Sequence, residues 1–339
     1  MTMKQCIEKC LSGESLTADE AAGALELIMT DQASESQIAG LLVALRAKGE
    51  TVDELVGFAR TMREKSVKVK AEDPHAIDMC GTGGDGLGTF NISTLASIVA
   101  AGAGVTVAKH GNRSVSSRSG SADMLKALGV NITLPPERAA DCLNAVGVSF
   151  LFAPLFHPAM KFAAKTRSDL GVRTIFNLLG PITNPAGVRK QLIGTYREDV
   201  ATRLADAVGR LATERTCVVH ANDGMDEVGV SGATTVFEVG AEAGVRKYTV
   251  TARTFGLPER PGSSVVGGTP EENADIALRV LEKAPGPHRD VVVVNAAFGI
   301  YVSGKANDLG EASALAAESI DSGRAMSTLR RLVEYSNRP

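Results

Sequence analysis

The chain lacks several features that mark common classes of protein. It has no tryptophan, and aromatic residues make up only 4% of its 339 residues. Its five cysteines are scattered without a Cys-x-x-Cys pair, which argues against a disulfide framework or a zinc site and fits reduced thiols in the cytoplasm. No apolar run reaches the ~18 residues of a membrane span, and residues 1–12 contain no hydrophobic signal segment.

An excess of positive charge is also missing. The chain has 36 Lys and Arg against 39 Asp and Glu, a net charge of −3. This balance disfavours a general electrostatic attraction to nucleic acid or to an anionic membrane. Hydrophobic residues make up 44% of the chain, enough to bury a sizeable core, and the length suggests two domains. Glycine is abundant, with 35 residues, which indicates tight turns and close approach of the backbone to a ligand.

The pattern of apolar residues divides the chain into two parts. Residues 1–70 predict only helices, because capping boxes recur at Thr17/Glu20, Ser34/Gln37 and Thr51/Glu54. From residue 76 short β-branched runs alternate with Ala- and Leu-rich stretches, which predicts a mainly parallel sheet covered by helices. We expect strands at 76–79, 105–108, 148–152, 191–196, 217–220, 234–239, 247–251 and 291–294, and helices at 91–103, 121–129, 136–146, 158–169, 198–212, 271–284 and 308–337.

A glycine-rich stretch at residues 78–86 (DMCGTGGDG) follows the first expected strand and leads to a helix that begins near Asn91. Glycines let backbone N–H groups approach an anion closely, and the helix start adds unpaired N–H donors and the positive end of its dipole. Ser93 and Thr94 add hydroxyls. This arrangement favours a phosphate cradle over the alternative, a plain glycine-rich turn. It is not a P-loop, and Cys80 is more simply a small strand residue than a nucleophile.

A second polar stretch, residues 109–123 (KHGNRSVSSRSGSAD), follows the expected strand at 105–108. Thirteen of its fifteen residues are polar or glycine, so we expect a loop, and Ser121 is expected to cap the next helix. Loops at the carboxyl ends of parallel strands are where open α/β sheets bind ligands. Lys109 and Arg113 are therefore candidate phosphate partners, while His110 alone more often has a structural role. A solvated loop is the alternative.

Two further groups of residues carry weaker signals. His157 precedes a proline and Arg167 lies on an expected helix, so a helix cap and a solvated arginine are the simpler interpretations. Asp226 and Glu227 follow the strand expected at 217–220, and adjacent carboxylates can hold a hard cation through oxygen ligands. Acidic loops without a metal are also common.

Taken in order, these motifs resemble the anthranilate phosphoribosyltransferase family, which acts in the tryptophan branch of aromatic amino-acid biosynthesis. The resemblance rests on DMCGTGGDG, NIST, KHGNRSVSSRSGSAD, HPAMK with Arg167, RTIFNLLGPITNP and GMDE, and covers about residues 10–335. It implies a small helical domain at 1–70, to which 166–190 contributes, and a large α/β domain at 74–165 and 191–339. It also implies a homodimer formed through the helical domain.

The resemblance implies the site residues as well. The set implied for phosphoribosyl pyrophosphate is Gly81, Gly84, Asp85, Thr89, Asn91, Ile92, Ser93, Thr94, Lys109, His110, Gly111, Asn112, Arg113, Ser114, Val115, Ser116, Ser117 and Ser121. The set implied for anthranilate is Gly81, Asn112, His157 and Arg167, and magnesium, two ions per subunit, is assigned to Ser93, Asp226 and Glu227.

The implied reaction is the transfer of the phosphoribosyl group to the amine of anthranilate, with pyrophosphate as the leaving group. It requires neither a covalent nucleophile nor a strong base, so no catalytic residue of either kind is expected. The chain departs from the family pattern after HPAMK, where Lys165 and Ser168 replace a proline and a second arginine. Two rival classes are a pyrimidine nucleoside phosphorylase of the same fold class and a nucleic-acid-binding relative, which would be basic.

Overall fold

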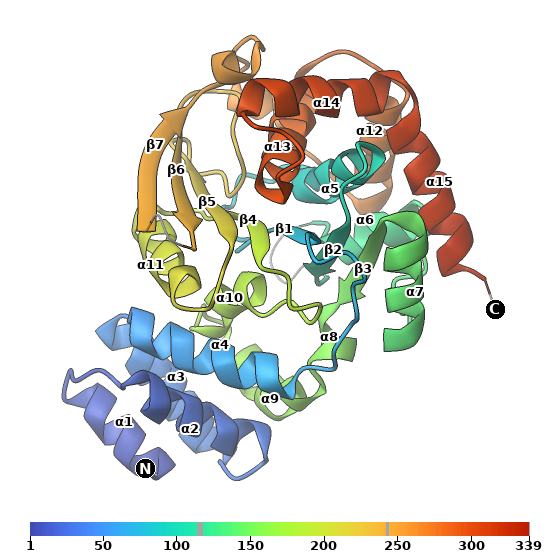
Figure 1. Cartoon of the computed structure of the whole chain (residues 1–339). Helices are drawn as coiled ribbons and strands as arrows, with labels where there is room; N and C mark the ends of the chain where they lie inside the picture. The colour runs from blue at the N-terminus through green and yellow to red at the C-terminus, as the bar shows by residue number, and fades with distance from the viewer. Residues whose placement is uncertain (114–117, 242–243, 339) are drawn as a thin grey trace.

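Two regions of different architecture make up the molecule (Figure 1). A computed structural model describes residues 1–113, 118–241 and 244–338. At one end a bundle is formed by α1 (Met3–Leu11), α2 (Ala18–Met29), α3 (Glu35–Lys48) and α4 (Val52–Lys65). The larger region is built around a seven-stranded sheet that helices cover. This confirms the expected combination of a helical part with an α/β part.

The sheet is mostly parallel. Its strands are β1 (Ile77–Gly81), β2 (Val107–Gly111), β3 (Val148–Phe152), β4 (Lys190–Gly194), β5 (Arg215–Ala221), β6 (Thr234–Gly240) and β7 (Gly244–Val250). They lie in the order β3-β2-β1-β4-β5-β6-β7; the first five are parallel, while β6 runs antiparallel to both of its neighbours, β5 and β7. The strand order reverses at β1, and ligands of open α/β sheets bind at the carboxyl ends of the strands at such a point.

The helices of the larger region follow the alternation that the sequence predicts, with two exceptions. They are α5 (Ile92–Gly102), α6 (Ser121–Ala127), α7 (Pro136–Val146), α8 (Ala153–Phe156), α9 (Lys161–Leu170), α10 (Phe176–Leu179), α11 (Glu198–Gly209), α12 (Pro270–Leu281), α13 (Pro287–Ser303), α14 (Leu309–Asp321) and α15 (Arg324–Ser336), with short 3₁₀ turns at 158–160, 180–182, 252–255 and 262–265. The strand expected at 291–294 is wrong, since these valines lie within α13. The single helix expected at 308–337 is two helices, separated at Ser322 and Gly323, where φ is +80°.

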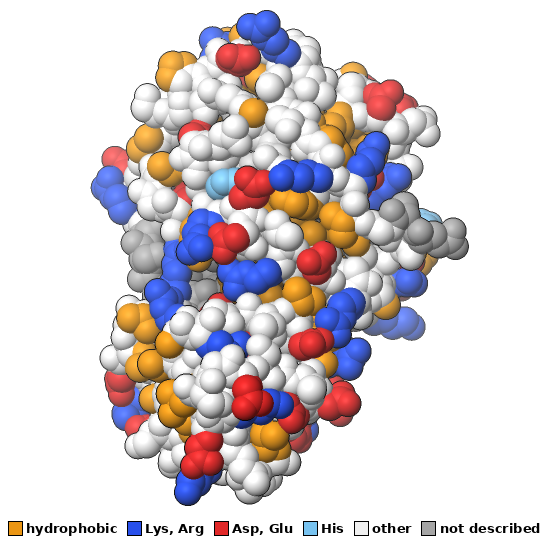
Figure 2. All heavy atoms as spheres, turned by 90° about the vertical axis from the view of Figure 1, so that its left-hand side faces the viewer, with side chains coloured by type: hydrophobic (Ala, Val, Ile, Leu, Met, Phe, Trp, Pro, Cys, Tyr) orange, Lys and Arg blue, Asp and Glu red, His pale blue; other side chains and the backbone are white. Residues whose placement is uncertain are grey.

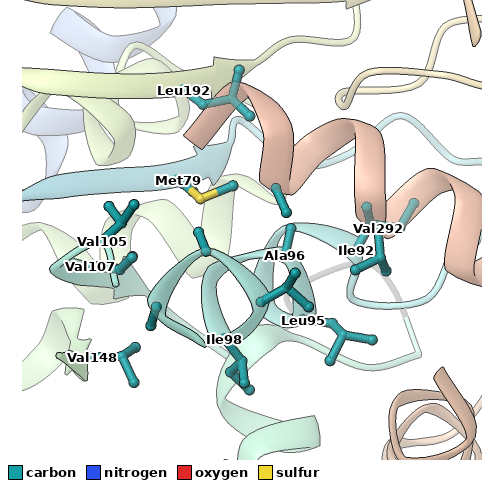
Figure 3. Packing of buried hydrophobic residues seen from close by; sticks show 14 of the residues in the cluster. Met79, Ile92, Leu95, Ala96, Ile98, Val105, Val107, Val148, Leu192 and Val292 are labelled. Carbon is teal, nitrogen blue, oxygen red and sulfur yellow. The ribbon is translucent and has the colours of Figure 1, made fainter. Parts of the chain in front are cut away.

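The core of the larger region lies between the sheet and the helices α5 and α13. Figure 3 shows Met79 of β1 pointing toward α5 and α13, while Val292 of α13 lies beside Ile92 of α5. Gly299 allows α13 to approach β1 closely, because a Cβ at this position would lie 2.5 Å from the sulfur of Met79. The approach anchors α13 on the strand at whose end the glycine-rich stretch begins.

A second core joins the bundle to a distant part of the chain. Side chains of α9 and α10, including Ala163 and Phe176, are buried with those of α2, α3 and α4. The rings of Phe58 in α4 and Phe176 in α10 meet edge to face, with centroids 6.1 Å apart. The segment around residues 163–182 therefore packs on the helical end of the molecule, although it follows the third strand in sequence.

The three predicted capping boxes are present at the starts of α2, α3 and α4. Glu54 does more than close its box: its fully buried carboxylate also accepts from the Leu16 backbone N–H at 2.9 Å and pairs with Lys48 at 3.1 Å. The cap expected at Ser121 is wrong, because α6 has Gly120 as its N-cap and Ser121 is the first helical residue. Among the described residues, no helix combines the length and apolar character that crossing a membrane requires.

Candidate active site

Three carboxylates meet where the glycine-rich stretch after β1 lies against the loop after β5. Oxygen atoms of Asp85, Asp226 and Glu227 all lie within 4.8 Å of one another. One oxygen of Asp85 and one of Glu227 are buried without a hydrogen-bond partner. Asp85, which the sequence analysis places with the phosphate residues, thus joins the two residues assigned to metal. Of the three residues Asp226 is buried and the other two are half-buried, and carboxylates this close and shielded from water require a positive charge between them or a proton.

The carboxyl groups of Asp226 and Glu227 hold protons more tightly than carboxyl groups in water. Burial, and then the nearby charge of Asp85, raise the pKa of Asp226 to about 6. Burial, followed by the charges of Asp226 and Asp85, raises the pKa of Glu227 well above its usual range. A divalent cation would reverse this tendency, because it stabilises the ionised forms of all three groups.

Backbone contacts explain why Asp226 reaches the glycine-rich stretch. The Gly83 N–H donates to Oδ2 of Asp226 at 2.6 Å. At the ends of β1 and β4, Gly81 and Gly194 leave room for this loop: a Cβ would lie 2.3 Å from Oδ2 of Asp226 and 1.6 Å from its carbonyl oxygen, respectively. Neither position accepts a larger residue without moving the acidic pair.

Asn295 of α13 fixes the other side of the acidic loop. Its Oδ1 accepts from the Val228 N–H at 3.0 Å, and its amide nitrogen donates to the Val228 carbonyl at 3.0 Å. Sequence reasoning missed this residue, because an asparagine in an apolar run carries no signal for a loop that precedes it by almost seventy residues. The two bonds hold the backbone immediately after Glu227.

The start of α5 has the character of an anion site. Asn91, its N-cap, makes no side-chain bond to the helix. Its amide instead donates to the Ser119 carbonyl at 3.1 Å and accepts from the Asn273 amide at 2.9 Å. The N–H groups of the first turn, which includes Ser93 and Thr94, consequently have no side-chain cap, as an anion-binding helix start requires. Thr94 donates to the hydroxyl of Ser121 at 2.9 Å, which brings the second polar stretch to this helix.

Lys109 and His110 are not loop residues, which corrects the sequence analysis. They belong to β2, and their side chains are 3% and 6% exposed. The ammonium group of Lys109 donates to the Met79 carbonyl at 2.6 Å and to Oγ of Ser93 at 3.3 Å, and burial lowers its pKa. Lys109 therefore links β1, β2 and the start of α5 and contributes a buried positive charge.

Two histidines form a neutral aromatic pair beside this charge. The rings of His110 and His157 lie 5.1 Å apart between centroids. Burial lowers the pKa of His110 to about 3 and that of His157 to about 4. Nδ1 of His110 donates to the Gly180 carbonyl at 3.1 Å, so Nε2, which is buried without a partner, carries a free lone pair. His157 thus lies next to the predicted phosphate residues, which its position before a proline does not indicate.

Arg167 extends from α9 toward the helical end of the molecule. Its guanidinium lies over the ring of Phe176, 5.0 Å from the centroid, and burial lowers its pKa. Among the residues with described coordinates, no carboxylate lies within 4 Å of it to form a salt bridge. A half-buried guanidinium without a carboxylate is suited to receive one from a ligand.

The structure also places the other residues that the family resemblance implies for the substrates. Thr89 forms an isolated antiparallel bridge with Val266. Gly111 ends β2, where a Cβ would lie 2.7 Å from the Phe150 ring. Asn112 accepts from the Arg113 N–H at 2.7 Å, and Arg113 lies 5.9 Å from the centroid of the Phe152 ring. Ile92 is buried in the first turn of α5. Ser114, Val115, Ser116 and Ser117 lie outside the described residues.

Arg173 is a contact of the glycine-rich stretch that sequence reasoning did not single out. Its guanidinium donates to the carbonyls of Gly83, at 3.3 Å, and Gly84. It also lies over the ring of Tyr196, 4.0 Å from the centroid. The only signal in the sequence is its place at the start of the RTIFNLLGP motif.

Family models match both regions of the chain. Residues 73–326 match the α/β domain of a glycosyl transferase family, and residues 4–66 match the helical bundle domain of a glycosyl transferase family. The chain is 52% identical over 334 residues to an anthranilate phosphoribosyltransferase of Pelotomaculum thermopropionicum, covering 98% of this chain and 96% of that protein. It is 51% identical over 335 residues to the enzyme of that name from Moorella thermoacetica, covering 98% of each.

Solved structures agree with this relationship. The crystal structure of anthranilate phosphoribosyltransferase from Thermus thermophilus superposes with a TM-score of 0.92 at 43% identity, over 98% of this chain and 99% of that one. The enzyme from Saccharomyces cerevisiae in complex with phosphoribosyl pyrophosphate and magnesium superposes with a TM-score of 0.89 at 29% identity, over 98% and 97% of the two chains. The likeness thus extends over both regions and the contact between them.

Proposed function

The chain belongs to the anthranilate phosphoribosyltransferase family, and from this we propose that the site around Asp85, Asp226 and Glu227 binds the diphosphate of phosphoribosyl pyrophosphate with two magnesium ions. The enzyme transfers the phosphoribosyl group to the amine of anthranilate and releases pyrophosphate. It is a pentosyltransferase of tryptophan biosynthesis. The observation that carries the assignment of the site is the group of three carboxylates within 4.8 Å, held on the glycine-rich stretch.

The residues present fit magnesium. Hard cations prefer oxygen ligands, and two of the carboxylates have buried oxygens without a partner. The hydroxyl of Ser93 completes the proposed set, although it already accepts from Lys109. Magnesium would neutralise the donor's diphosphate and stabilise the negative charge of the departing pyrophosphate.

The chain's own groups supply binding and orientation. The uncapped N–H groups at the start of α5 and the backbone of residues 81–86 are donors for the donor's phosphate oxygens. Lys109 adds a positive charge whose position is fixed by bonds to β1 and α5. Positioned donors of this kind act on charge that develops as the C–O bond breaks.

The histidine pair and Arg167 form the proposed acceptor side, with Gly81 and Asn112. Neutral rings of His110 and His157 provide an uncharged surface for an aromatic amine, and Arg167 offers its guanidinium to the carboxylate of anthranilate. A pKa of about 3 makes His110 a weak base. That suffices, because the neutral arylamine attacks first and loses its proton late.

The experiment that tests the site combines substrate fluorescence with substitution of the acids. Loss of anthranilate fluorescence on adding phosphoribosyl pyrophosphate and magnesium measures the reaction. Asp226→Asn with Glu227→Gln is expected to lower kcat by about a hundredfold or more, in line with the loss of metal-assisted charge stabilisation. Asp223→Asn, a change in the same loop, is the control. An unchanged magnesium dependence in the double variant would contradict the assignment. Phosphorolysis of thymidine instead would identify the rival phosphorylase.

The state of the protein in the cell is also proposed. We propose a homodimer formed through residues 1–65, supported by apolar side chains such as Leu11 and Val43 that α1 and α3 leave exposed. A cytoplasmic location is supported by five free cysteines. We also propose a division into 1–70 with 166–190 and 74–165 with 191–339; burial of Ile175, Phe176 and Leu179 with the bundle supports the place given to 166–190, although α11 shares the same core.

A further inference from the structure

A cavity of about 500 Å³, lined in part by charged side chains, lies beside the glycine-rich stretch and does not contain the three carboxylates. Residues of α3, of the segment that begins α10 and of the connection from β4 to α11 line it. The charged and polar residues that line it include Arg46, Glu50, Arg173, Thr174, Asn177 and Arg203. Figure 2, which shows the face that α11 presents, has Lys and Arg side chains gathered across its middle.

The positive charge of this cavity is only partly compensated. Its lining contains four arginines and two carboxylates. Arg203 pairs with both carboxylates, at 3.4 Å from Glu50 and 3.0 Å from Asp199. Arg46 and Arg173 have no carboxylate within 4 Å among the residues that the structure describes. Two guanidinium groups on one cavity are therefore left without countercharge.

Thr174 and Asn177 add neutral hydrogen-bond donors to the same cavity, and these donors, like the guanidinium groups, suit a negatively charged ligand. Thr174 is 3% exposed, and its hydroxyl is buried without a hydrogen-bond partner. Oδ1 of Asn177 accepts from the Thr174 N–H at 3.0 Å, which leaves the amide nitrogen of Asn177 as a donor. A buried hydroxyl without a partner is costly unless a ligand satisfies it.

We propose that this cavity is a second, regulatory anion site, which binds phosphate-class oxyanions such as inorganic phosphate or pyrophosphate. Two guanidiniums and two neutral donors match the several oxygens of such an ion. The site is coupled to the proposed donor site on which this inference rests, because Arg173 also donates to the carbonyls of Gly83 and Gly84. An anion that binds Arg173 withdraws it from the glycine-rich stretch, so it weakens binding of phosphoribosyl pyrophosphate there.

Calorimetric titration of the magnesium-free full-length protein tests binding without relying on activity. Inorganic phosphate and pyrophosphate are titrated separately into wild type, Arg46→Gln and the control Arg60→Gln. Arg60 is an exposed arginine of α4 outside the cavity, and Gln at 46 can keep the hydrogen bond to the Arg173 carbonyl. We expect Arg46→Gln to weaken binding about tenfold, the loss of one charge-assisted contact, with no change in Arg60→Gln. Equal affinity in all three proteins, or no binding to wild type, overturns the site.

Kinetics then test the coupling. In wild type, added phosphate is expected to raise the KM for phosphoribosyl pyrophosphate; in Arg46→Gln this effect is lost while kcat and KM without phosphate stay unchanged. An equal rise of KM in both proteins would place the inhibiting phosphate in the donor site and overturn the coupling. Failure of the donor-site assignment is distinct from either result, because it appears as an unchanged magnesium dependence in the Asp226 and Glu227 double variant. Tighter binding of pyrophosphate than of phosphate would identify the reaction product as the occupant.

Discussion

At the scale of single residues, Asp226 shows that a residue of the proposed site can lower the stability of the folded protein. Asp226 is ionised only at a cost, because burial and Asp85 raise its pKa from 3.8 to about 6. A carboxyl group whose pKa is raised in the folded state contributes stability below its unfolded pKa, and this stability is lost as the pH rises through the folded pKa. The magnesium-free protein therefore carries a cost at neutral pH that bound metal would offset.

Asp226→Asn is expected to stabilise the magnesium-free protein at pH 8 by about 1–3 kcal/mol, the equivalent of up to two pKa units. The gain should shrink between pH 6 and pH 4, where the wild-type carboxyl regains its proton. Urea unfolding at pH 4, 6 and 8 in the presence of a chelator measures this. A difference between the two proteins that does not vary with pH would contradict it.

Arg167 is the residue expected to distinguish the two substrates. Arg167→Ala should raise the KM for anthranilate about tenfold or more, because a buried charge-assisted contact with the carboxylate is lost, and should leave the KM for phosphoribosyl pyrophosphate nearly unchanged. Arg167→Lys should restore little, since an ammonium group lacks the planar pair of donors. If only the KM of the phosphoribosyl donor rises, Arg167 belongs to the phosphate site instead.

Helices and strands could be predicted from the sequence where the residues that signal them lie close together in the chain. The boxes at Thr17, Ser34 and Thr51 involve contacts three residues apart, and all three helices begin where they predict. The strand predicted from the run of valines at 291–294 was wrong because α13 is buried along residues 290–302, so no apolar periodicity distinguishes a helix from a strand there. The strand position of Lys109 and the contact of Arg173 could not be predicted for another reason: their partners, Met79 and the glycine-rich stretch, lie 30 and about 90 residues away.

The contact between helices α2 and α4 depends on a glycine whose role is testable. A Cβ at Gly57 would lie 2.2 Å from the Ala18 carbonyl and 2.8 Å from Cβ of Ala21, whereas a Cβ at Gly23 meets nothing within 4 Å. Gly57→Ala is therefore expected to lower the free energy of unfolding by about 1–3 kcal/mol through overpacking. Gly23→Ala, the matched control in α2, should be neutral or stabilise by up to about 1 kcal/mol through helix propensity. Chemical denaturation compares the two; equal effects would show that the bundle relaxes freely.

At the scale of the whole molecule, the site depends on both regions. The three carboxylates proposed to hold metal lie in loops that follow β1 and β5, and Lys109 lies in β2, while Arg167 and Arg173 come from the segment at 163–182 that packs on the helical bundle. The proposed acceptor side thus combines His110 of β2 with Arg167 of α9, and Arg173 reaches the proposed donor side from the segment packed on the bundle. Sequence patterns place each set on its own element, but only packing brings Phe176 against Phe58 and thereby fixes where Arg167 lies.

Exposed apolar residues of α1 and α3 allow the proposed dimer to be tested. Leu11 is 71% exposed at the end of α1, and Val43 is 46% exposed on α3, although both helices already bury other apolar side chains against the bundle. Covering them in a second copy would recover the hydrophobic free energy that exposure forfeits. Wild type should sediment at twice 35.3 kDa at micromolar concentration, and Leu11→Asp with Val43→Asp should shift it to the monomer. Val245→Asp, on a 44% exposed residue of the edge strand β7, should leave the mass unchanged. A wild-type species of a single chain's mass would refute the dimer, and dissociation by the control would place its interface at the edge of the sheet instead.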